Sequence, residues 1–256
     1  MKDIVVIIPV HEISDDVREL LPRAIKSVPK GMEIRVSCAN GLSEGLKEII
    51  GNNKNVVLYE DENENSGNGF QKLVNQAVGE SNWFTILEFD DEFTEIWLNN
   101  ALKYIDFKPE ISVLMCMEDM FDDKGEYIGI GNDAPWASSF SNELGYIDND
   151  CLNDYFDFYM TGSLFNTSDW ETCGGLKESM KVTFWYEFML RLTQMGKQIF
   201  VMPKVGYKHM LGRKGSLIEI YKETISDEEG QWWFDLARQE YFFKEDRNKA
   251  YQPEEK

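Results

Sequence analysis

Hydrophobic residues follow two alternating patterns along the first half of the chain. Residues 4–10 (IVVIIPV) form a run of mostly β-branched residues, which is typical of a strand buried on both faces. After Ser14, a residue type that caps helices, apolar side chains recur at helical spacing up to Val28. The same alternation predicts further strands at 33–39, 55–61, 83–89 and 111–117, with helices near 43–50, 70–78 and 97–105 between them.

Strand–helix alternation at this spacing predicts a mostly parallel sheet whose right-handed crossovers place helices on its faces. In such a sheet the ligand site lies beyond the carboxyl ends of the strands. We therefore expect the α/β fold class, with the functional residues at strand ends.

The second half of the chain has a less regular pattern. It predicts a hairpin turn at 122–127, a polar loop at 136–150, strands at 158–166 and 198–204, and a helix at 184–196 that Gly196 ends.

From residue 216 the sequence is charged and aromatic. Its apolar stripe predicts a helix and consists of Trp233, Leu236, Ala237 and Tyr241. We therefore expect one domain over residues 1–215 and a C-terminal helical extension over residues 216–256 that packs on it.

Composition and charge narrow the possible partners. Lys and Arg total 26 against 46 Asp and Glu, which gives a net charge of −20, and no basic run exceeds two residues. This balance disfavours nucleic acid or an anionic membrane as the main partner. The apolar stretch near the N-terminus is too short for a membrane span, and the four cysteines lie far apart without a CxxC pair. We expect a cytoplasmic protein without a membrane span, whose oligomeric state the sequence leaves open.

An acidic cluster ends the strand predicted at 83–89. The segment FTILEFDDEF (84–93) places four carboxylates within five positions, at Glu88, Asp90, Asp91 and Glu92. Residues two apart in an extended chain point to the same side, so Glu88 and Asp90 face one direction while Phe89 turns into the core. Two such carboxylates can bind Mg²⁺ or Mn²⁺, and the ion can neutralise a diphosphate. The alternative is a solvated strand end in an acidic protein.

The order of motifs resembles the family 2 glycosyltransferases of the GT-A fold. The motifs are IIPV (7–10), NSGNGFQKLVNQA (65–77), ILEFDD (86–91) at the place of the family's DXD motif, TGSLFNTSDWETCGGLKESM (161–180) and FWYEFMLRLTQMGKQIFVMPKVGYKH (184–209). The resemblance covers roughly residues 3–210, and within the family it is most similar to enzymes of large tailed bacteriophages. It implies a GT-A fold and transfer of a sugar from a nucleotide-diphosphate donor.

The resemblance also implies a donor site, with a UDP-sugar as the favoured donor. The paired aspartates that usually close the family's second strand are replaced by Ala39 and Asn40, which leaves the nucleotide base open. Arg213 and Lys214 lie in a glycine-punctuated loop that can close over the diphosphate, with an ordinary solvated loop as the alternative. The implied donor-binding residues are Pro9, Val10, His11, Glu12, Asn40, Asn65, Lys72, Glu88, Phe89, Gly174, Gly175, Arg213 and Lys214.

The resemblance further implies an Mn²⁺ or Mg²⁺ cofactor. Asp90 keeps the second acid of the DXD motif, usually the direct metal ligand, and Glu88 replaces the first. His209 matches a histidine that completes the metal or diphosphate site in many relatives, although a histidine of the ordinary core is the alternative. Asp91 is a second ligand or a supporting charge.

The catalytic base of the family has no direct counterpart in this sequence. Inverting relatives use an aspartate six residues before the arginine of the helix, and here Trp185 stands six residues before Arg191. Glu187 is the nearest carboxylate and Glu178, in the GGLKE loop, is its substitute. A plain ion pair between Glu187 and Arg191 is the alternative.

Aromatic residues are candidates for the acceptor side. Trp185 and Tyr186 can stack on a sugar face, and Trp136 lies in the polar segment 131–150 that we expect to face the acceptor.

The leading hypothesis is a metal-dependent, inverting glycosyltransferase that acts on a hydroxyl of a glycan, protein or small molecule. One alternative is a catalytically inactive module that binds a glycan or nucleotide, which the replaced motifs favour. Another is a phage enzyme acting on modified DNA bases, which the net charge disfavours. A nucleotidylyltransferase is disfavoured because residues 11–19 (HEISDDVRE) contain no glycine.

Overall fold

The computed structural model describes residues 4–61, 69–133, 144–239 and 241. A ten-stranded sheet runs through this part of the chain in the order β3-β2-β1-β4-β9-β6-β10-β5, with β7 paired to β6 and β8 to β10. The strands are β1 (Ile4–Val10), β2 (Glu33–Cys38), β3 (Val56–Glu60), β4 (Trp83–Ile86), β5 (Glu92–Phe93), β6 (Ile111–Phe121), β7 (Tyr127–Gly131), β8 (Gly145–Ile147), β9 (Leu164–Asn166) and β10 (Gln198–Met210).

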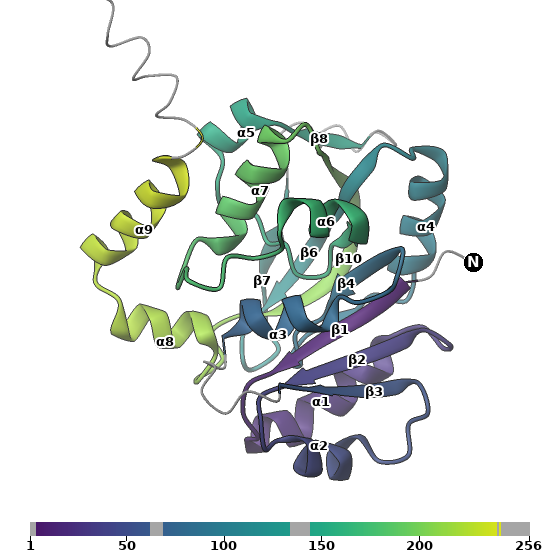
Figure 1. Ribbon diagram of the computed structural model, residues 1–256. Coiled ribbons are helices and arrows are strands. Elements are labelled where there is room, and N and C mark those ends of the chain that lie inside the picture. Colours follow the sequence, from purple (N-terminus) through teal and green to yellow (C-terminus); the bar gives the residue numbers. More distant parts are fainter. Residues whose placement is uncertain (1–3, 62–68, 134–143, 240, 242–256) are drawn as a thin grey trace, which may run out of the picture.

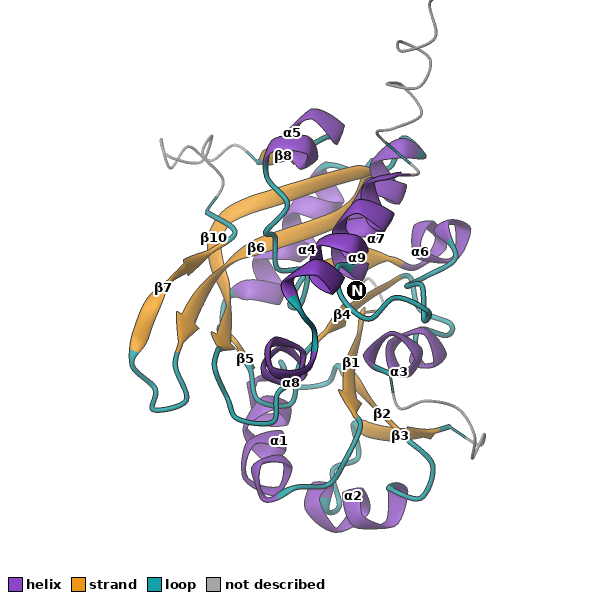
Figure 2. Ribbon diagram, turned by 90° about the vertical axis from the view of Figure 1, so that its left-hand side faces the viewer, coloured by secondary structure: helices purple, strands orange, loops and turns teal. Residues whose placement is uncertain are grey.

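Helices cover both faces of this sheet (Figures 1 and 2). They are α1 (Asp15–Ser27), α2 (Ser43–Ile50), α3 (Phe70–Ala77), α4 (Trp97–Phe107), α5 (Asn149–Asp154), α6 (Thr167–Cys173), α7 (Phe184–Gln194), α8 (Leu217–Thr224) and α9 (Asp227–Gln239). Alternate residues of β1 enter two separate cores: Val6 and Ile8 pack with α1, α2 and α4, whereas Val5 and Ile7 pack with α3, α6 and α7. The continuous apolar run of β1 is thereby explained, because both of its faces are buried.

Most predicted elements of the first half are confirmed. The helix after Ser14 begins as expected, because the Ser14 side chain accepts a hydrogen bond from the Val17 amide at 3.3 Å. The hairpin turn at 122–127 is also confirmed: the Asp122 side chain accepts hydrogen bonds from the amides of Lys124 and Glu126, and Gly125 has φ +80°.

The expected parallel direction of the central strands is confirmed, and short antiparallel strands make the complete sheet mixed. The short strand β9 inserts antiparallel to both β4 and β6, while β1–β2, β2–β3, β1–β4 and β6–β10 are parallel. Consequently β1, β4, β6 and β10 still run in the same direction, and their carboxyl ends share one edge of the sheet.

Several predicted boundaries were wrong. β4 ends at Ile86 rather than 89, because the backbone turns where the Asp91 amide donates to the Glu88 carbonyl at 3.1 Å. Only residues 164–166 of the strand expected at 158–166 pair in the sheet. The loop expected at 136–150 contains β8 and the start of α5 within its described part.

β10 is also longer than the predicted strand 198–204. It passes Pro203, which has no amide hydrogen to donate, through a register shift between Met202 and Val205. The longer strand carries His209 to the carboxyl edge of the sheet.

The last helix, α9, and Tyr241 beyond it contact the α7 side of the molecule. Trp233, Phe234, Ala237 and Tyr241 pack on the core beside α7, and the Phe234 ring stacks on Tyr186 at 5.2 Å between centroids. Leu236, expected in the same stripe, is 40% exposed. The boundary between residues 215 and 216 stays a prediction. Among the described helices, none combines the length and apolarity that crossing a bilayer requires.

We predict that Gly206→Ala destabilises the protein by about 1–3 kcal/mol, because an added methyl group overpacks this part of the core. A Cβ there would lie 2.6 Å from the Trp97 ring and 2.7 Å from Cys116. Urea denaturation measures the change. Gly129→Ala is the matched control in another strand, since its Cβ would meet only Met120, at 3.6 Å. Equal stabilities of the two variants would contradict the packing described for β10.

Candidate active site

An acidic cluster occupies the shared carboxyl edge of β1, β4, β6 and β10. The loop after β4 supplies Glu88, Asp90 and Asp91, while His209 comes from the end of β10 and Arg213 from the loop behind it. The fold therefore brings together five of the residues that the sequence assigned to the metal and the diphosphate.

Arg213 pairs directly with Asp90. Its Nε donates to Asp90 Oδ2 at 2.7 Å, its Nη1 lies 3.2 Å from Asp16, and its guanidinium carbon is 4.7 Å from the centre of the Phe89 ring. Asp90 and Arg213 are both buried, and Phe89 is buried beneath them in the core as predicted. Arg213 thus ties the loop after β10 to the acidic cluster.

Glu88 and Asp91 flank this pair in different surroundings. Asp91 is buried and accepts a hydrogen bond from the Met210 amide at 2.7 Å. Glu88 is half-buried, and its backbone amide donates to Tyr207 Oη at 3.0 Å. Burial, followed by the charge of Asp90, raises the pKa of Glu88 to about 7. Burial also raises the pKa of Asp91 well above its ordinary value.

His209 forms a buried pair with Glu118. Its Nδ1 lies 3.0 Å from Glu118 Oε2. Burial alone would lower the pKa of His209, but Asp91, Glu118 and Glu88 outweigh burial and raise it to about 10. The sequence reasoning missed Glu118. One signal was present, because Glu118 is the first charged residue after the apolar run 111–117. It lies at the same edge of the sheet as Asp90.

The predicted metal residues do not form a closed metal site. Among the described residues, no three His, Cys, Asp or Glu side chains are placed to hold one ion. Mg²⁺ is commonly bound through one or two carboxylates together with the phosphates of a substrate. Glu88 and Asp90 have the oxygen donors that such an ion prefers.

The residues assigned to the nucleotide lie at the ends of β1 and β2. Pro9 and Val10 are buried, whereas Glu12 and Asn40 are exposed. His11 is half-buried, and burial lowers its pKa.

Two lysines that were also predicted to bind the donor have different surroundings. Lys72 forms an ion pair with Asp61 just beyond β3, whereas Lys214 is exposed. Asn65 and Trp136 lie outside the described residues.

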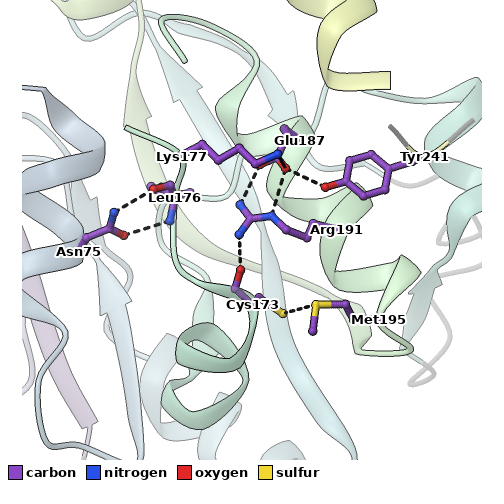
Figure 3. A network of polar contacts seen from close by, with 8 residues as sticks. All are labelled: Asn75, Cys173, Leu176, Lys177, Glu187, Arg191, Met195 and Tyr241. Atoms are coloured by element: carbon purple, nitrogen blue, oxygen red, sulfur yellow. Dashed lines mark hydrogen bonds and ion pairs between the residues drawn. The ribbon is translucent and has the colours of Figure 1, made fainter. Parts of the chain in front are cut away.

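A second network surrounds Glu187, the first candidate base (Figure 3). Glu187 is only 1% exposed and accepts hydrogen bonds from Arg191 Nε at 3.0 Å, Arg191 Nη2 at 2.8 Å and Tyr241 Oη at 2.8 Å. Lys177 Nζ lies 2.8 Å away. Burial would raise its pKa, but these donors outweigh burial and lower it. The ion pair with Arg191 that the sequence left as an alternative is therefore present.

The loop with Gly174 and Gly175 places Glu178 beside α3. Both glycines have positive φ, and a Cβ on Gly175 would lie 2.5 Å from Asn75 Oδ1. Asn75 instead holds the loop, donating to the Leu176 carbonyl at 2.9 Å and accepting from the Leu176 amide at 3.0 Å (Figure 3). Glu178 is exposed, and Asn75 Nδ2 lies 3.3 Å from one of its oxygens.

The aromatic candidates on α7 are packed within the protein. Trp185 is half-buried and stacks on Phe165 with ring centres 5.9 Å apart. Tyr186 is buried between α7 and α9, and its hydroxyl donates to the Leu152 carbonyl at 2.8 Å. Their contact with an acceptor stays a prediction.

Comparison with known proteins identifies the family. Residues 5–162, more than half of the chain, match the family described as Glycosyl transferase family 2. The chain belongs to glycosyl transferase family 2. No curated protein matches it. The family resemblance expected from the motifs is thus confirmed, while the bacteriophage type stays a prediction.

Solved structures confirm the GT-A fold. S. aureus TarS 1–349 in complex with UDP-GlcNAc is 19% identical to this chain, with a TM-score of 0.61 over 86% of this chain and 61% of TarS 1–349. The complex of the same protein with UDP is 18% identical, with a TM-score of 0.58 over 90% of this chain and 68% of that one. This family 2 chain thus spans about 61% of the first of these proteins.

We predict that Glu88 contributes a loss of stability to the unliganded protein as pH rises from about 4.5 to 7. The folded-state pKa of Glu88, about 7, lies above the ordinary value of 4.5, so the folded state binds more protons in this window. Glu88→Gln should flatten the dependence of Tm on pH between 5 and 7.5. Glu171→Gln, at an exposed carboxylate on α6, is the control. A slope unchanged by Glu88→Gln would refute the assignment.

Proposed function

We propose that this chain transfers a sugar from a nucleotide-diphosphate donor, with UDP-sugars favoured, to a hydroxyl acceptor with inversion. The observation that carries the proposal is the position of Asp90 in a family 2 chain. Asp90 stands at the carboxyl end of β4 and is paired with Arg213 at 2.7 Å. The complexes of TarS with UDP-GlcNAc and UDP support the choice of donor.

An Mn²⁺ or Mg²⁺ ion belongs to this proposal. Asp90 would hold it together with Glu88, while Asp91 and His209 support the site. When bound, the ion supplies positive charge that stabilises the diphosphate leaving group. Arg213 and Lys214 approach the same diphosphate from the loop behind β10 and bind its oxygens.

We assign the general base to Glu178 rather than Glu187, on the basis of their surroundings. A base needs an oxygen that can reach the acceptor hydroxyl. The oxygens of Glu187 are buried and already accept bonds from Arg191 and Tyr241, whereas Glu178 is exposed on a loop that Asn75 fixes. Glu187 then serves to hold the loop through Lys177.

The acceptor that fits the net charge of −20 is a glycan, protein or small molecule rather than DNA. We place Trp136 and the half-buried Trp185 on the acceptor side, and we expect the protein to act in the cytoplasm.

A second candidate function is a catalytically inactive module that binds a nucleotide or glycan. Trp185 stands where inverting relatives carry their base, and Glu187 is fully engaged by its neighbours. Donor binding that persists in EDTA, without hydrolysis of any nucleotide sugar, would favour this function.

Asp90→Asn should abolish the metal-dependent part of donor binding, because it removes the charge that holds the ion. We expect UDP affinity in Mn²⁺ to fall at least about 10-fold, to the level measured in EDTA. Isothermal titration calorimetry measures the affinity, and hydrolysis of a panel of nucleotide sugars measures activity.

Asp169→Asn is the matched control. It also removes one carboxylate from an ion pair, here with Lys197, but at the start of α6 rather than in the acidic cluster. Metal-dependent UDP binding that survives Asp90→Asn would refute the proposed metal position.

Glu178→Gln should reduce activity, whereas Glu187→Gln should reduce stability. Glu178→Gln should lower kcat by about 10²–10⁴ with Tm unchanged, because only the proton acceptor is lost. Glu187→Gln should lower the free energy of unfolding by about 2 kcal/mol, because Arg191 and Lys177 lose their charged partner. Steady-state kinetics and urea denaturation separate the two effects. The reverse pattern would assign the base to Glu187.

A further inference from the structure

Glu118, the buried partner of His209, has no place in the proposed reaction so far. Glu118 is completely buried on β6, and β6 already pairs with β10 along a parallel ladder that includes Glu118–Tyr207 and Met120–His209. The two strands therefore do not need an ion pair to join them. Burying a carboxylate is costly, and an apolar pair would join two strands equally well.

The second carboxylate oxygen of Glu118 raises the free-energy cost of burying this side chain. Among the described residues, Glu118 Oε1 has no hydrogen-bond partner. A fully buried carboxylate with only one oxygen in a hydrogen bond is poorly explained as a contribution to the stability of the fold. Its visible effect is on His209: with Nδ1 directed to Glu118 Oε2 at 3.0 Å, Nε2 is the ring nitrogen left for a ligand.

Two tyrosines hold the His209 ring from other sides. The rings of Tyr159 and Tyr207 contact it edge-on, with centres 5.0 and 6.3 Å away. The imidazole is therefore fixed by packing as well as by its hydrogen bond.

Asn132 in turn fixes the position of Tyr159. Its side chain accepts from the Tyr159 amide at 2.9 Å and donates to the Tyr159 carbonyl at 2.8 Å and to the Cys116 carbonyl at 2.9 Å. Asn132 is buried and has φ +56°, a conformation unusual for a residue other than glycine.

His209 and Asp90 line the same cleft of about 330 Å³, together with Arg23 and Lys208. The fixed ring thus borders the space next to the carboxylate that carries the proposed donor site.

We propose that Glu118 is a positioning residue for donor binding: it holds His209 through Nδ1 so that Nε2 is presented to the donor diphosphate. Asn132 supports this arrangement through Tyr159. The inference rests on the proposed function, since it requires a nucleotide-diphosphate donor beside Asp90.

Imidazole resonances test the inference directly. The chain has two histidines, so protein labelled with ¹⁵N-histidine gives two imidazole patterns, and His209→Gln identifies the one from His209. With UDP and Mg²⁺ as the probe, we expect the Nε2 signal of His209 to shift while Nδ1 keeps the signature of a hydrogen-bonded N–H. UDP binding without a shift at His209 would overturn the inference and leave the proposed function intact.

Glu118→Gln should change the Nδ1 signal and raise the Kd for UDP about 10-fold, the size of effect found for residues that orient a ligand. It should raise KM for the donor more than it lowers kcat. Asn132→Gly keeps the backbone conformation, because glycine adopts positive φ readily, but removes the bridge to Tyr159, and we expect a smaller rise in Kd. This variant decides the question if Glu118→Gln does not fold.

Asp169→Asn controls for the loss of a carboxylate elsewhere and should leave the Kd for UDP unchanged. Values of Kd within twofold of the unmodified protein for both Glu118→Gln and Asn132→Gly would refute a positioning role. If the unmodified protein binds no nucleotide at all, the proposed function fails and the inference fails with it.

Discussion

The crowding of carboxyl groups at one edge of the sheet is the constraint on which the site depends. Four carboxylates gather there, those of Glu88, Asp90, Asp91 and Glu118. Two cationic groups face them, Arg213 at 2.7 Å from Asp90 and His209 at 3.0 Å from Glu118. A diphosphate is itself negative, so it can approach this edge only with positive charge in between. The pair of Arg213 and Asp90 therefore lies at the centre of the proposed donor site.

The site contains two separate networks of polar contacts. The acidic cluster belongs to the strand ends and to the loop that carries Arg213. The network around Glu187 joins α7, the GGLKE loop through Lys177 and the C-terminal part of the chain through Tyr241. This second network holds the loop that carries Glu178, so Tyr241 ties the C-terminal part of the chain to the proposed acceptor side.

The sequence predicted the parts of the fold that depend on local periodicity. The buried run of β1, the helix after Ser14 and the acidic end of β4 were recognisable because each follows from residue spacing alone. The insertion of β9 was not predictable, because a strand of three residues has no periodicity and its antiparallel partners lie far away in sequence. Family resemblance located Asp90, His209 and Arg213. Glu118 was missed because its contact with His209 depends on the pairing of β6 with β10, which no local pattern reports.

The interpretation of Glu187 also changed for a physical reason. Spacing alone allowed both a base and an ion pair with Arg191, and only the three-dimensional contacts with Lys177 and Tyr241 show how completely its oxygens are used. A crystal structure with Mn²⁺ and UDP, using the anomalous signal of manganese, tests the central claim most directly. The account predicts manganese held by the Asp90 carboxylate, next to the bound diphosphate and His209. Bound UDP with no manganese at Asp90, or with its diphosphate away from this edge of the sheet, would contradict it.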